Sequence, residues 1–257
     1  MRLGVVADIH GNGHALEAAL AFLSAQEVDA YLCAGDLVGY GPAPNECVRR
    51  ACALPGQGVA GNHDLIAIGE LGDERCDQRA RDSLRWTRTV LEDDARALLG
   101  ELPRGATAHG VALHHGSPGD PREYVRTEDQ ALACLDDLAR MTSGAEILVL
   151  GHTHESLAVG RRRGTLLKAT TGSVRLLPGE LTLLNPGSVG QSRSRDPRAR
   201  VMVLDLAARA ATFHAVAYDV AACRDALREQ GLPPDSCHPW RSHWGVLVHA
   251  LTRGRHA

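Results

Sequence analysis

Short polar clusters follow several of the apolar runs in this sequence, and that arrangement constrains the fold more than any other feature. The first run, Leu3–Ala7, ends in such a cluster, and residues with helical spacing follow over Ala15–Leu23. The same order recurs around Ala30–Ala34 and Gly58–Ala60. Loops at strand ends are where a rigid sheet can bring polar side chains together. The repeated pattern therefore predicts one polar site at the edge of a sheet.

The periodicity changes after His154. Before it, the pattern predicts two more strands, at Ala108–His114 and Glu146–Leu150. It also predicts helices at Pro44–Ala53 and Glu128–Met141, and one or two helices within Asp73–Leu99. After it, Gly and Pro separate short runs typical of a meander, at Ser156–Val159, Thr165–Lys168, Ser173–Leu177, Glu180–Leu184, Val201–Leu206 and Ala211–Ala217. A helix over Val220–Gln230 follows. This order predicts two packed sheets flanked by helices.

The length and composition are those of an ordinary globular protein. The chain has 257 residues, of which 44% are hydrophobic and 23% charged. A domain of this size buries roughly 75% of the surface of the unfolded chain, so neither a disulfide nor a structural metal is needed for stability. Any bound metal would therefore serve chemistry. We expect one domain over residues 1–231 and a C-terminal tail, 232–257, whose Trp240 and Trp244 pack on it.

Charge and cysteine usage exclude several classes of protein. The net charge of -3 lacks the basic excess of a protein that holds nucleic acid by its overall field. The seven cysteines are odd in number and form no Cys-x-x-Cys pair, which favours reduced thiols over a disulfide framework or a zinc ribbon. The first apolar run is too short for a signal sequence or a membrane span. These features predict a cytoplasmic protein without a membrane partner.

Five short motifs carry the residue types that bind metal ions. They are Asp8-Ile9-His10, Gly35-Asp36, Gly61-Asn62-His63-Asp64, His115-Gly116 and Gly151-His152-Thr153-His154. Any one of them has a ready structural explanation, because a buried, hydrogen-bonded histidine is commoner than a metal ligand. Together they supply enough oxygen and imidazole ligands for two divalent ions. The predicted ligands are Asp8, His10, Asp36, Asn62, His115, His152 and His154.

In this order the motifs resemble the signature of the calcineurin-like metallophosphoesterase superfamily, D-x-H, G-D, G-N-H-[DE], H and G-H-x-H. The resemblance extends from Met1 to about Gly231, and the runs Asp36–Pro42, His115–Pro118 and Asn185–Gln191 are similar to its small bacterial branch. It implies an α/β (α+β) fold, a four-layer α/β/β/α sandwich of two mixed sheets, with a dinuclear centre at the strand ends.

The resemblance also implies a role for each motif residue. One ion would be held by Asp8, His10 and His154, and the other by Asn62, His115 and His152, with Asp36 bridging them. The ions would come from Mn, Fe, Zn, Ni or Co, with Mn expected in vitro. His115 is preferred to His114 as the ligand because Gly116 follows it. The loop Asn185–Gln191 is either a strand-ending turn or a rim loop of the site.

His63 matches the general acid of the superfamily. The alternative is a donor that positions phosphate without transferring a proton, and Asp64 is the candidate to orient its ring. Tyr40, Asn62 and Arg193 are the predicted substrate-binding residues. The expected activity is hydrolysis of phosphoester bonds, as a phosphodiesterase or phosphatase, in a small soluble phosphoester or nucleotide.

Three alternatives remain open at this stage. Phosphoprotein phosphatases of the superfamily carry G-D-x-x-D-R-G, whereas Gly39 and Tyr40 stand here in place of the second Asp and the Arg, which counts against that activity. A nuclease would need the arginines at Arg161–Arg163 to form one positive groove with those after Gln191, which are Arg193, Arg195, Arg198 and Arg200. A non-catalytic scaffold is disfavoured by the intact ligand set.

Overall fold

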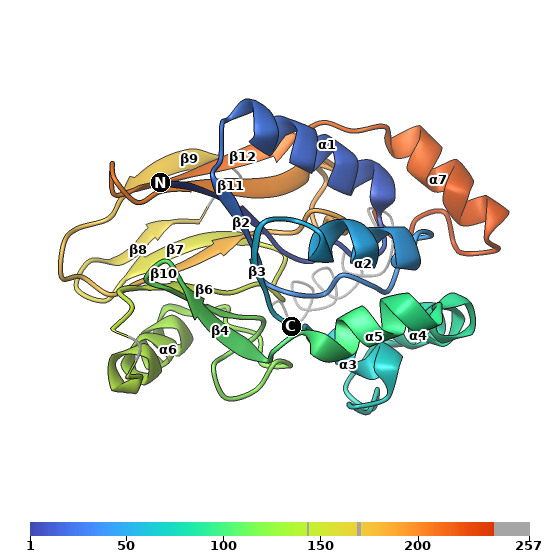
Figure 1. Ribbon diagram of the computed structural model, residues 1–257, viewed down its shortest axis with the longest axis horizontal. Coiled ribbons are helices and arrows are strands. Elements are labelled where there is room, and N and C mark those ends of the chain that lie inside the picture. Colours follow the sequence, from blue (N-terminus) through green and yellow to red (C-terminus); the bar gives the residue numbers. More distant parts are fainter. Residues whose placement is uncertain (143, 169–170, 239–257) are drawn as a thin grey trace, which may run out of the picture.

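Strand β1 (Arg2–Val6) lies inside the first of two six-stranded sheets, and its end leads into the first polar cluster (Figure 1). The computed structural model describes residues 1–142, 144–168 and 171–238. The first sheet has the order β3-β2-β1-β11-β12-β9, in which the other strands are β2 (Ala30–Cys33), β3 (Gly56–Gly58), β9 (Gly172–Arg175), β11 (Ala199–Asp205) and β12 (Ala210–Val216). β1 pairs in parallel with β2 and antiparallel with β11, so the sheet is mixed.

The second sheet has the order β4-β5-β6-β10-β7-β8. Its strands are β4 (Gly105–Ala108), β5 (Val111–His114), β6 (Ile147–Val149), β7 (Ser156–Gly160), β8 (Gly164–Leu167) and β10 (Thr182–Pro186). β6 pairs in parallel with both β5 and β10, whereas β10 pairs antiparallel with β7. Because β5 and β6 are parallel, the loops that leave them emerge at the same edge of this sheet.

Helices cover both outer faces of the sheet pair (Figure 1). On the first sheet lie α1 (Gly13–Ala25) and α2 (Pro44–Cys52), with α7 (Val220–Glu229) packed against α1, and α6 (Glu128–Arg140) packs on the second sheet. Three further helices form a group against α2, namely α3 (Asn62–Ile68), α4 (Gln78–Val90) and α5 (Asp93–Glu101). The two mixed sheets between helices confirm the predicted fold class.

The space between the sheets is filled by alternate residues of their strands. Leu3 and Val5 of β1 face the second sheet, whereas Val6 packs under the helices. From the other side, Leu113 of β5 and Val149 of β6 enter the same inter-sheet cluster. This alternation is the period-two pattern of a strand that is buried on both faces. The inter-sheet core therefore fixes the two sheets, and the loops at their edges, against each other.

Most expected elements are present, but three expectations were wrong. The polar cluster at Gly61–Asp64 opens a helix, α3, because Gly61 N-caps it and the Asp64 carboxylate accepts from the Gly61 N–H. The expected strand Ala108–His114 is a hairpin, β4–β5, whose turn places His109 and Gly110 at positive φ. The strands after His154 do not form one meander, since β9 joins the first sheet beside β12 while β10 inserts between β6 and β7.

The described part of the C-terminal segment packs on the domain. Leu232 and Cys237 are buried with Cys223 of α7, and Arg79 of α4 donates to the Asp235 carboxylate at 3.0 Å. The two tail tryptophans, Trp240 and Trp244, lie outside the described residues. All seven cysteines are free thiols. Among the described helices, none is both long enough and apolar enough to cross a membrane.

Replacement of Phe213 tests the importance of the inter-sheet core. Phe213 is fully buried in the cluster between the sheets. We expect Phe213→Ala to lower the free energy of unfolding by about 3–5 kcal/mol, because it removes apolar contacts and leaves a cavity. Urea unfolding followed by circular dichroism measures the change. The control is Leu177→Ala at an exposed position, which should change stability by less than about 0.5 kcal/mol.

Candidate metal centre

Loops from both sheets meet at one buried cluster of polar side chains. Asp8 and His10 follow β1, Asp36 follows β2, and the N–H groups of Asp8 and His10 donate to Gly35 and Asp36 carbonyl oxygens at 2.9 Å. From the second sheet, the Gly151 N–H donates to the His115 carbonyl at 2.8 Å. These backbone bonds hold neighbouring loops together within each sheet. The side chains that they carry are buried, although all are polar.

The backbone at this cluster adopts the left-handed region at five residues that are not glycine. These residues have φ values between 50° and 66° and are Asp8, His10, Asp36, His152 and His154. Most side chains are disfavoured in this region, at a cost of order 1–3 kcal/mol each where the conformation is strained. The surrounding hydrogen bonds must compensate for that cost. Such conformations turn the chain sharply at the strand ends, so that successive polar side chains enter one space.

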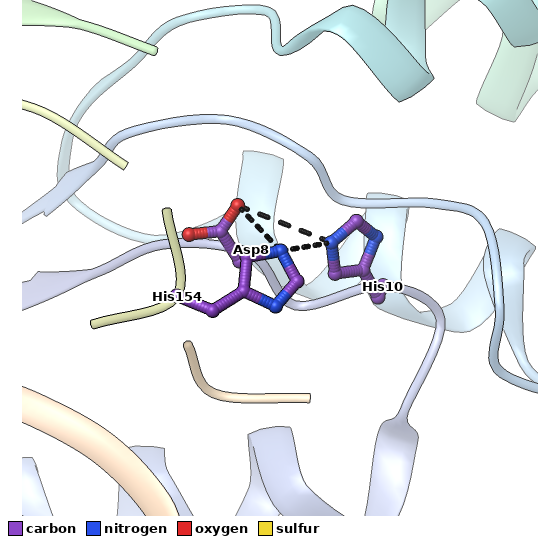
Figure 2. A group of neighbouring side chains, drawn as sticks. All are labelled: Asp8, His10 and His154. Atoms are coloured by element: carbon purple, nitrogen blue, oxygen red, sulfur yellow. Dashed lines mark hydrogen bonds and ion pairs between the residues drawn. The ribbon is translucent and has the colours of Figure 1, made fainter. Parts of the chain in front are cut away.

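Figure 2 shows the first group, Asp8, His10 and His154, with their polar atoms converging. The Nε2 atoms of the two histidines lie 3.1 Å apart, and an Asp8 carboxylate oxygen lies 3.5 Å from His154 Nε2 and 3.9 Å from His10 Nε2. One ligand atom from each residue lies within 4.8 Å of the others, so the three could hold one ion.

The hydrogen bonds of the histidine rings define where their protons lie. Nδ1 of His10 lies 3.0 Å from the Val38 carbonyl oxygen, and Nδ1 of His154 lies 2.7 Å from that of Gln191. A carbonyl oxygen can only accept, so both Nδ1 atoms carry hydrogen. Burial lowers the pKa of His10 to about 3 and that of His154 well below its usual value. Both rings are therefore neutral, and their Nε2 lone pairs face each other.

Two facing lone pairs repel unless a cation lies between them. A divalent ion fits this arrangement, because neutral imidazole nitrogens held by carbonyl acceptors are the usual donors to a metal. A carboxylate beside them adds the negative charge that such an ion requires. The residues of this group thus fit a metal ion by their chemistry as well as by their proximity.

A second group surrounds Asp36. Nε2 of His115 lies 3.2 Å from an Asp36 carboxylate oxygen and 3.1 Å from the Asn62 side-chain oxygen, while its Nδ1 lies 2.6 Å from the Ala34 carbonyl. Burial lowers the pKa of His115, but the charge and hydrogen bond of Asp36, the charge of Asp8 and the bond to Ala34 together outweigh it and raise the pKa to about 9. A cation at this position would replace the Nε2 proton. His152 completes the group, with a buried Nε2 that has no hydrogen-bond partner in the described chain.

Asp36 is common to both groups. One of its oxygens lies 3.7 Å from His10 Nε2 as well as near His115, and the other accepts from the His63 N–H at 2.8 Å. The structure therefore brings all seven predicted ligands into one cluster, with Asp36 between its two halves. His114, by contrast, is only partly buried, and its ring lies over Gly105 at the edge of the sheet.

Asp64 does not orient His63, contrary to the hypothesis from the sequence. One carboxylate oxygen accepts from the N–H groups of Leu37 and Val38, at 2.8 and 3.2 Å, and the other accepts from Gly61 at 2.9 Å. Adjacent side chains on a helix point in different directions, which explains the difference. Asp64 instead ties the loop that carries Asp36 to the start of α3.

His63 lies at the first turn of α3 with its ring beside those of His10 and Tyr40, at centroid distances of 4.8 and 5.0 Å. Its Nδ1 is buried and has no hydrogen-bond partner among the described residues. Gly39 explains why no side chain from the preceding loop contacts this atom. A Cβ at Gly39 would lie 2.4 Å from His63 Nδ1, so the imidazole occupies the space that an aspartate would need.

The predicted substrate-binding residues surround the cluster unequally. Tyr40 is buried, with its ring edge against His10 at 4.8 Å. Arg193 is exposed. Burial of His154 is the largest cause of its lowered pKa, and the charge of Arg193 is the next. The Arg193 guanidinium lies 5.5 Å from the ring of Tyr124, a residue to which the sequence assigned no role. Tyr124 stacks on the His152 ring at 3.9 Å. The only sequence signal for this contact was the presence of an aromatic residue shortly after the His115 motif.

The loop Asn185–Gln191 is not a rim loop but a buried support for the cluster. The Ser188 hydroxyl donates to the Asp8 carbonyl at 2.8 Å, and the Asn185 amide donates to the Gly151 carbonyl at 2.6 Å. Gln191 supplies the carbonyl that holds His154. Close approach requires glycine at position 190, where a Cβ would lie 1.7 Å from the Ile9 carbonyl oxygen.

Comparison with known proteins agrees with this architecture. The sequence model of the calcineurin-like phosphoesterase superfamily domain matches residues 1–209. An uncharacterized protein of Methanocaldococcus jannaschii is 28% identical over 237 residues, which are 90% of this chain and 93% of that protein. The crystal structure of a metallophosphoesterase from Sphaerobacter thermophilus is 32% identical with a TM-score of 0.79, and the match covers 93% of this chain and 98% of that one.

A hypothetical protein from Pyrococcus horikoshii OT3 shares the fold, with a TM-score of 0.75 at 20% identity over 92% of this chain and 96% of its own. The two mixed sheets and the histidine–aspartate cluster at their edge define a metallophosphoesterase. The chain belongs to the calcineurin-like phosphoesterase superfamily.

Removal of one charge from Asp36 tests the shared position of this carboxylate. We expect Asp36→Asn to lower the metal content of the purified protein strongly, because both groups of ligands lose the same negative charge. Inductively coupled plasma mass spectrometry measures the metal per chain. Asp94→Asn, at an exposed carboxylate that pairs with Arg49, is the matched control and should keep the wild-type content. A full metal complement in Asp36→Asn would contradict the assignment.

Gly39→Ala tests whether the space beside His63 matters. Gly39 and Gly69 both have φ of 88°, but a Cβ at Gly69 meets nothing within 4 Å. Both alanine variants should therefore share a backbone cost of about 1 kcal/mol, measured by urea unfolding, while only Gly39→Ala displaces the His63 ring. In an NMR spectrum of Gly39→Ala, the His63 resonance should shift from its wild-type position. An unshifted resonance in Gly39→Ala, or an equal shift in Gly69→Ala, would show that this contact is not important.

Proposed function

We propose that this protein is a metal-dependent hydrolase of phosphoester bonds that acts on a small soluble phosphoester or a nucleotide. The proposal depends on one observation: the unprotonated Nε2 atoms of His10 and His154 lie 3.1 Å apart, beside the Asp8 carboxylate, in a buried site. Membership of the calcineurin-like phosphoesterase superfamily supports the reaction class.

Two divalent ions held by these residues would supply positive charge to a phosphoryl group and a nucleophilic water at neutral pH. Asp8, His10 and His154 would hold one ion, Asn62, His115 and His152 the other, and Asp36 both. Mn is the ion that we expect in vitro, although Fe, Zn, Ni and Co suit the same ligands. The carbonyl groups that fix the Nδ1 protons of His10, His115 and His154 keep these three rings in their ligating tautomer.

His63 is the proposed general acid. Its ring lies beside His10 and its Nδ1 has no partner in the described chain, which leaves the imidazole free to turn toward a leaving-group oxygen. Burial lowers its pKa, and the charge of Asp36 opposes that effect. A phosphate anion bound beside the ring would favour the imidazolium further. Arg193 would hold a phosphate oxygen at the mouth of the site, with Tyr40 and Asn62 lining it.

The arginines do not support a nuclease. In the turn Arg161–Arg163, Arg161 pairs with Asp136 at 2.6 Å and Arg163 with Glu180 at 2.6 Å. After Gln191, Arg198 and Arg200 both pair with Asp196. Four of the seven arginines that would form a groove are therefore compensated by acidic partners within the protein. Nucleic acid is not the favoured partner.

A phosphoprotein phosphatase is disfavoured for a different reason. The second Asp and the Arg of that branch have no equivalent, because Gly39 leaves no space for a side chain beside His63 and Tyr40 is a buried aromatic residue. A non-catalytic scaffold would not need the buried polar cluster, whose burial is costly without a cation. We propose a cytoplasmic location, which the free thiols favour.

The function itself is tested with wild-type protein loaded with Mn. Hydrolysis of p-nitrophenyl phosphate, bis-p-nitrophenyl phosphate and a set of nucleotides is compared with that of a phosphoserine peptide. The proposal requires turnover that a chelator abolishes and added Mn restores, on the small molecules and not on the peptide. Loss of turnover in Asp36→Asn excludes a contaminating enzyme.

His63→Ala tests the general acid through the leaving group. A nitrophenolate departs readily as an anion, whereas a ribose hydroxyl needs a proton in the transition state. We expect kcat on a nucleotide to fall by most of the 10²–10⁴ range typical of general acids, about 3–5 kcal/mol of barrier, and to fall much less on nitrophenyl esters. Metal content should remain at the wild-type level. Equal losses on both substrates would make His63 a positioning donor, and a parallel loss of metal would make it a ligand.

A further inference from the structure

The ring of Tyr124 contacts two arginines and one residue of the metal cluster. It lies in the loop between β5 and α6, and its ring stacks on the imidazole of His152 with a centroid distance of 3.9 Å and an interplanar angle of 23°. The Arg126 guanidinium lies over the same ring, 4.1 Å from its centroid. Two groups at this distance cannot share one face of a ring. Arg126 and His152 therefore lie on opposite faces of Tyr124.

Arg193 is the second cation on Tyr124, 5.5 Å from the ring centroid. Its Nε donates to the Gln191 side-chain oxygen at 3.4 Å, the same residue whose carbonyl holds His154. Arg193 thus approaches the cluster from the supporting loop of β10, and Arg126 from the loop that follows β5. Segments far apart in the sequence place two guanidinium groups around one aromatic ring.

Neither guanidinium has an acidic partner. Within the described parts of the chain, no carboxylate lies within 4.0 Å of Arg126 or Arg193, whereas most other arginines pair with Asp or Glu or donate to a backbone carbonyl. Two like charges near one another are unfavourable unless an anion offsets them. Stacking on Tyr124 stabilises each guanidinium by a cation–π interaction, but it does not remove the charge.

The site as a whole carries more positive charge than one phosphodiester can balance. Two divalent ions, if bound as proposed above, bring four positive charges, of which Asp8 and Asp36 offset two. Arg126 and Arg193 add two more. A phosphodiester carries a single negative charge and a phosphomonoester no more than two. A ligand with a second phosphate matches the excess better, and arginine forks are suited to phosphate oxygens.

We propose that Arg126 and Arg193, held on Tyr124, form a subsite for a second phosphate group of the substrate, next to the phosphate that reacts. The substrate class is then a phosphoanhydride, such as a nucleoside diphosphate or a longer polyphosphate ester. Its reacting phosphorus gains a bond to the oxygen of the attacking water and loses its P–O bond to the leaving group, whose oxygen takes up a proton. This inference rests on the proposed function for the position of the reacting phosphate. Arg193 lies nearer the cluster and contacts both phosphates, whereas Arg126, beyond Tyr124, contacts the second alone.

Binding of two phosphonates tests the subsite without any reaction. Methylenediphosphonate carries two phosphonate groups that cannot be hydrolysed, and methylphosphonate carries one. Both are titrated calorimetrically into the Mn-loaded protein, and metal content is measured afterwards to exclude removal of Mn by the ligand. We expect Arg126→Ala to weaken methylenediphosphonate binding about tenfold, the effect of one charge-assisted hydrogen bond, and to leave methylphosphonate binding unchanged. Arg193→Ala should weaken both.

Two further variants complete the test. Arg162→Ala removes an exposed arginine that lies at the far end of β7 from His154 and whose guanidinium also has no acidic partner among the described residues. This variant should change neither affinity. Arg126→Lys keeps the charge and should restore part of the binding. An unchanged affinity for methylenediphosphonate in Arg126→Ala would overturn the subsite. Equal weakening of both phosphonates would also overturn it, since Arg126 would then act only through Tyr124 and His152.

Failure of this inference and failure of the proposed function are distinguishable. If the protein hydrolyses phosphoesters but Arg126→Ala binds both phosphonates normally, only the subsite is wrong. If Arg126 determines preference for the diphosphonate but no phosphoester is hydrolysed, the subsite stands and the catalytic proposal fails. In kinetic assays the subsite predicts that Arg126→Ala raises KM for a nucleoside diphosphate and leaves KM for p-nitrophenyl phosphate unchanged.

Discussion

Three backbone carbonyls hold three histidine rings by their Nδ1 hydrogens, and the chemistry of the site depends on these bonds. They come from Ala34, Val38 and Gln191. Each fixes the proton on Nδ1 and directs Nε2 inward, toward the carboxylates of Asp8 and Asp36. Without them an imidazole could turn its N–H toward the cluster and lose its capacity to bind a metal. The carbonyls belong to loops, so the positions of the loops decide the chemistry.

Rigid support for those loops comes from the sheets beneath them. The inter-sheet core fixes β1 and β2 against β5 and β6, and the loop at Asn185–Gln191 bonds across the gap to Asp8 and Gly151. This support matters because five of the cluster residues have left-handed backbone conformations, which relax when the surroundings allow it. Stability of the core and geometry of the site are therefore coupled, because Ala34 and Val38, whose carbonyls hold His115 and His10, are themselves core residues.

The cluster also explains the pattern of charge around it. Buried carboxylates and neutral imidazoles form a cation site, and most arginines on the surface are paired with acids. Among the arginines without an acidic partner in the described chain, Arg126 and Arg193 lie on Tyr124, beside His152. Their position gives the protein a cationic flank on one side of the cluster. A small, highly charged phosphate compound fits this distribution better than an extended nucleic acid does.

Sequence alone determined the residue types, their order and the class of fold. Through their resemblance to the family signature, the D-x-H, G-D, G-N-H-D, H and G-H-x-H motifs predicted which side chains meet. Tertiary structure decided what has no local signal. The role of Asp64 in tying the Asp36 loop to α3 follows from its backbone partners 26 and 27 residues away. The stack of Tyr124 on His152 and the burial of Asn185–Gln191 arise from loops that fold together across two sheets, and the short-range pattern of a chain carries no information about contacts at that separation.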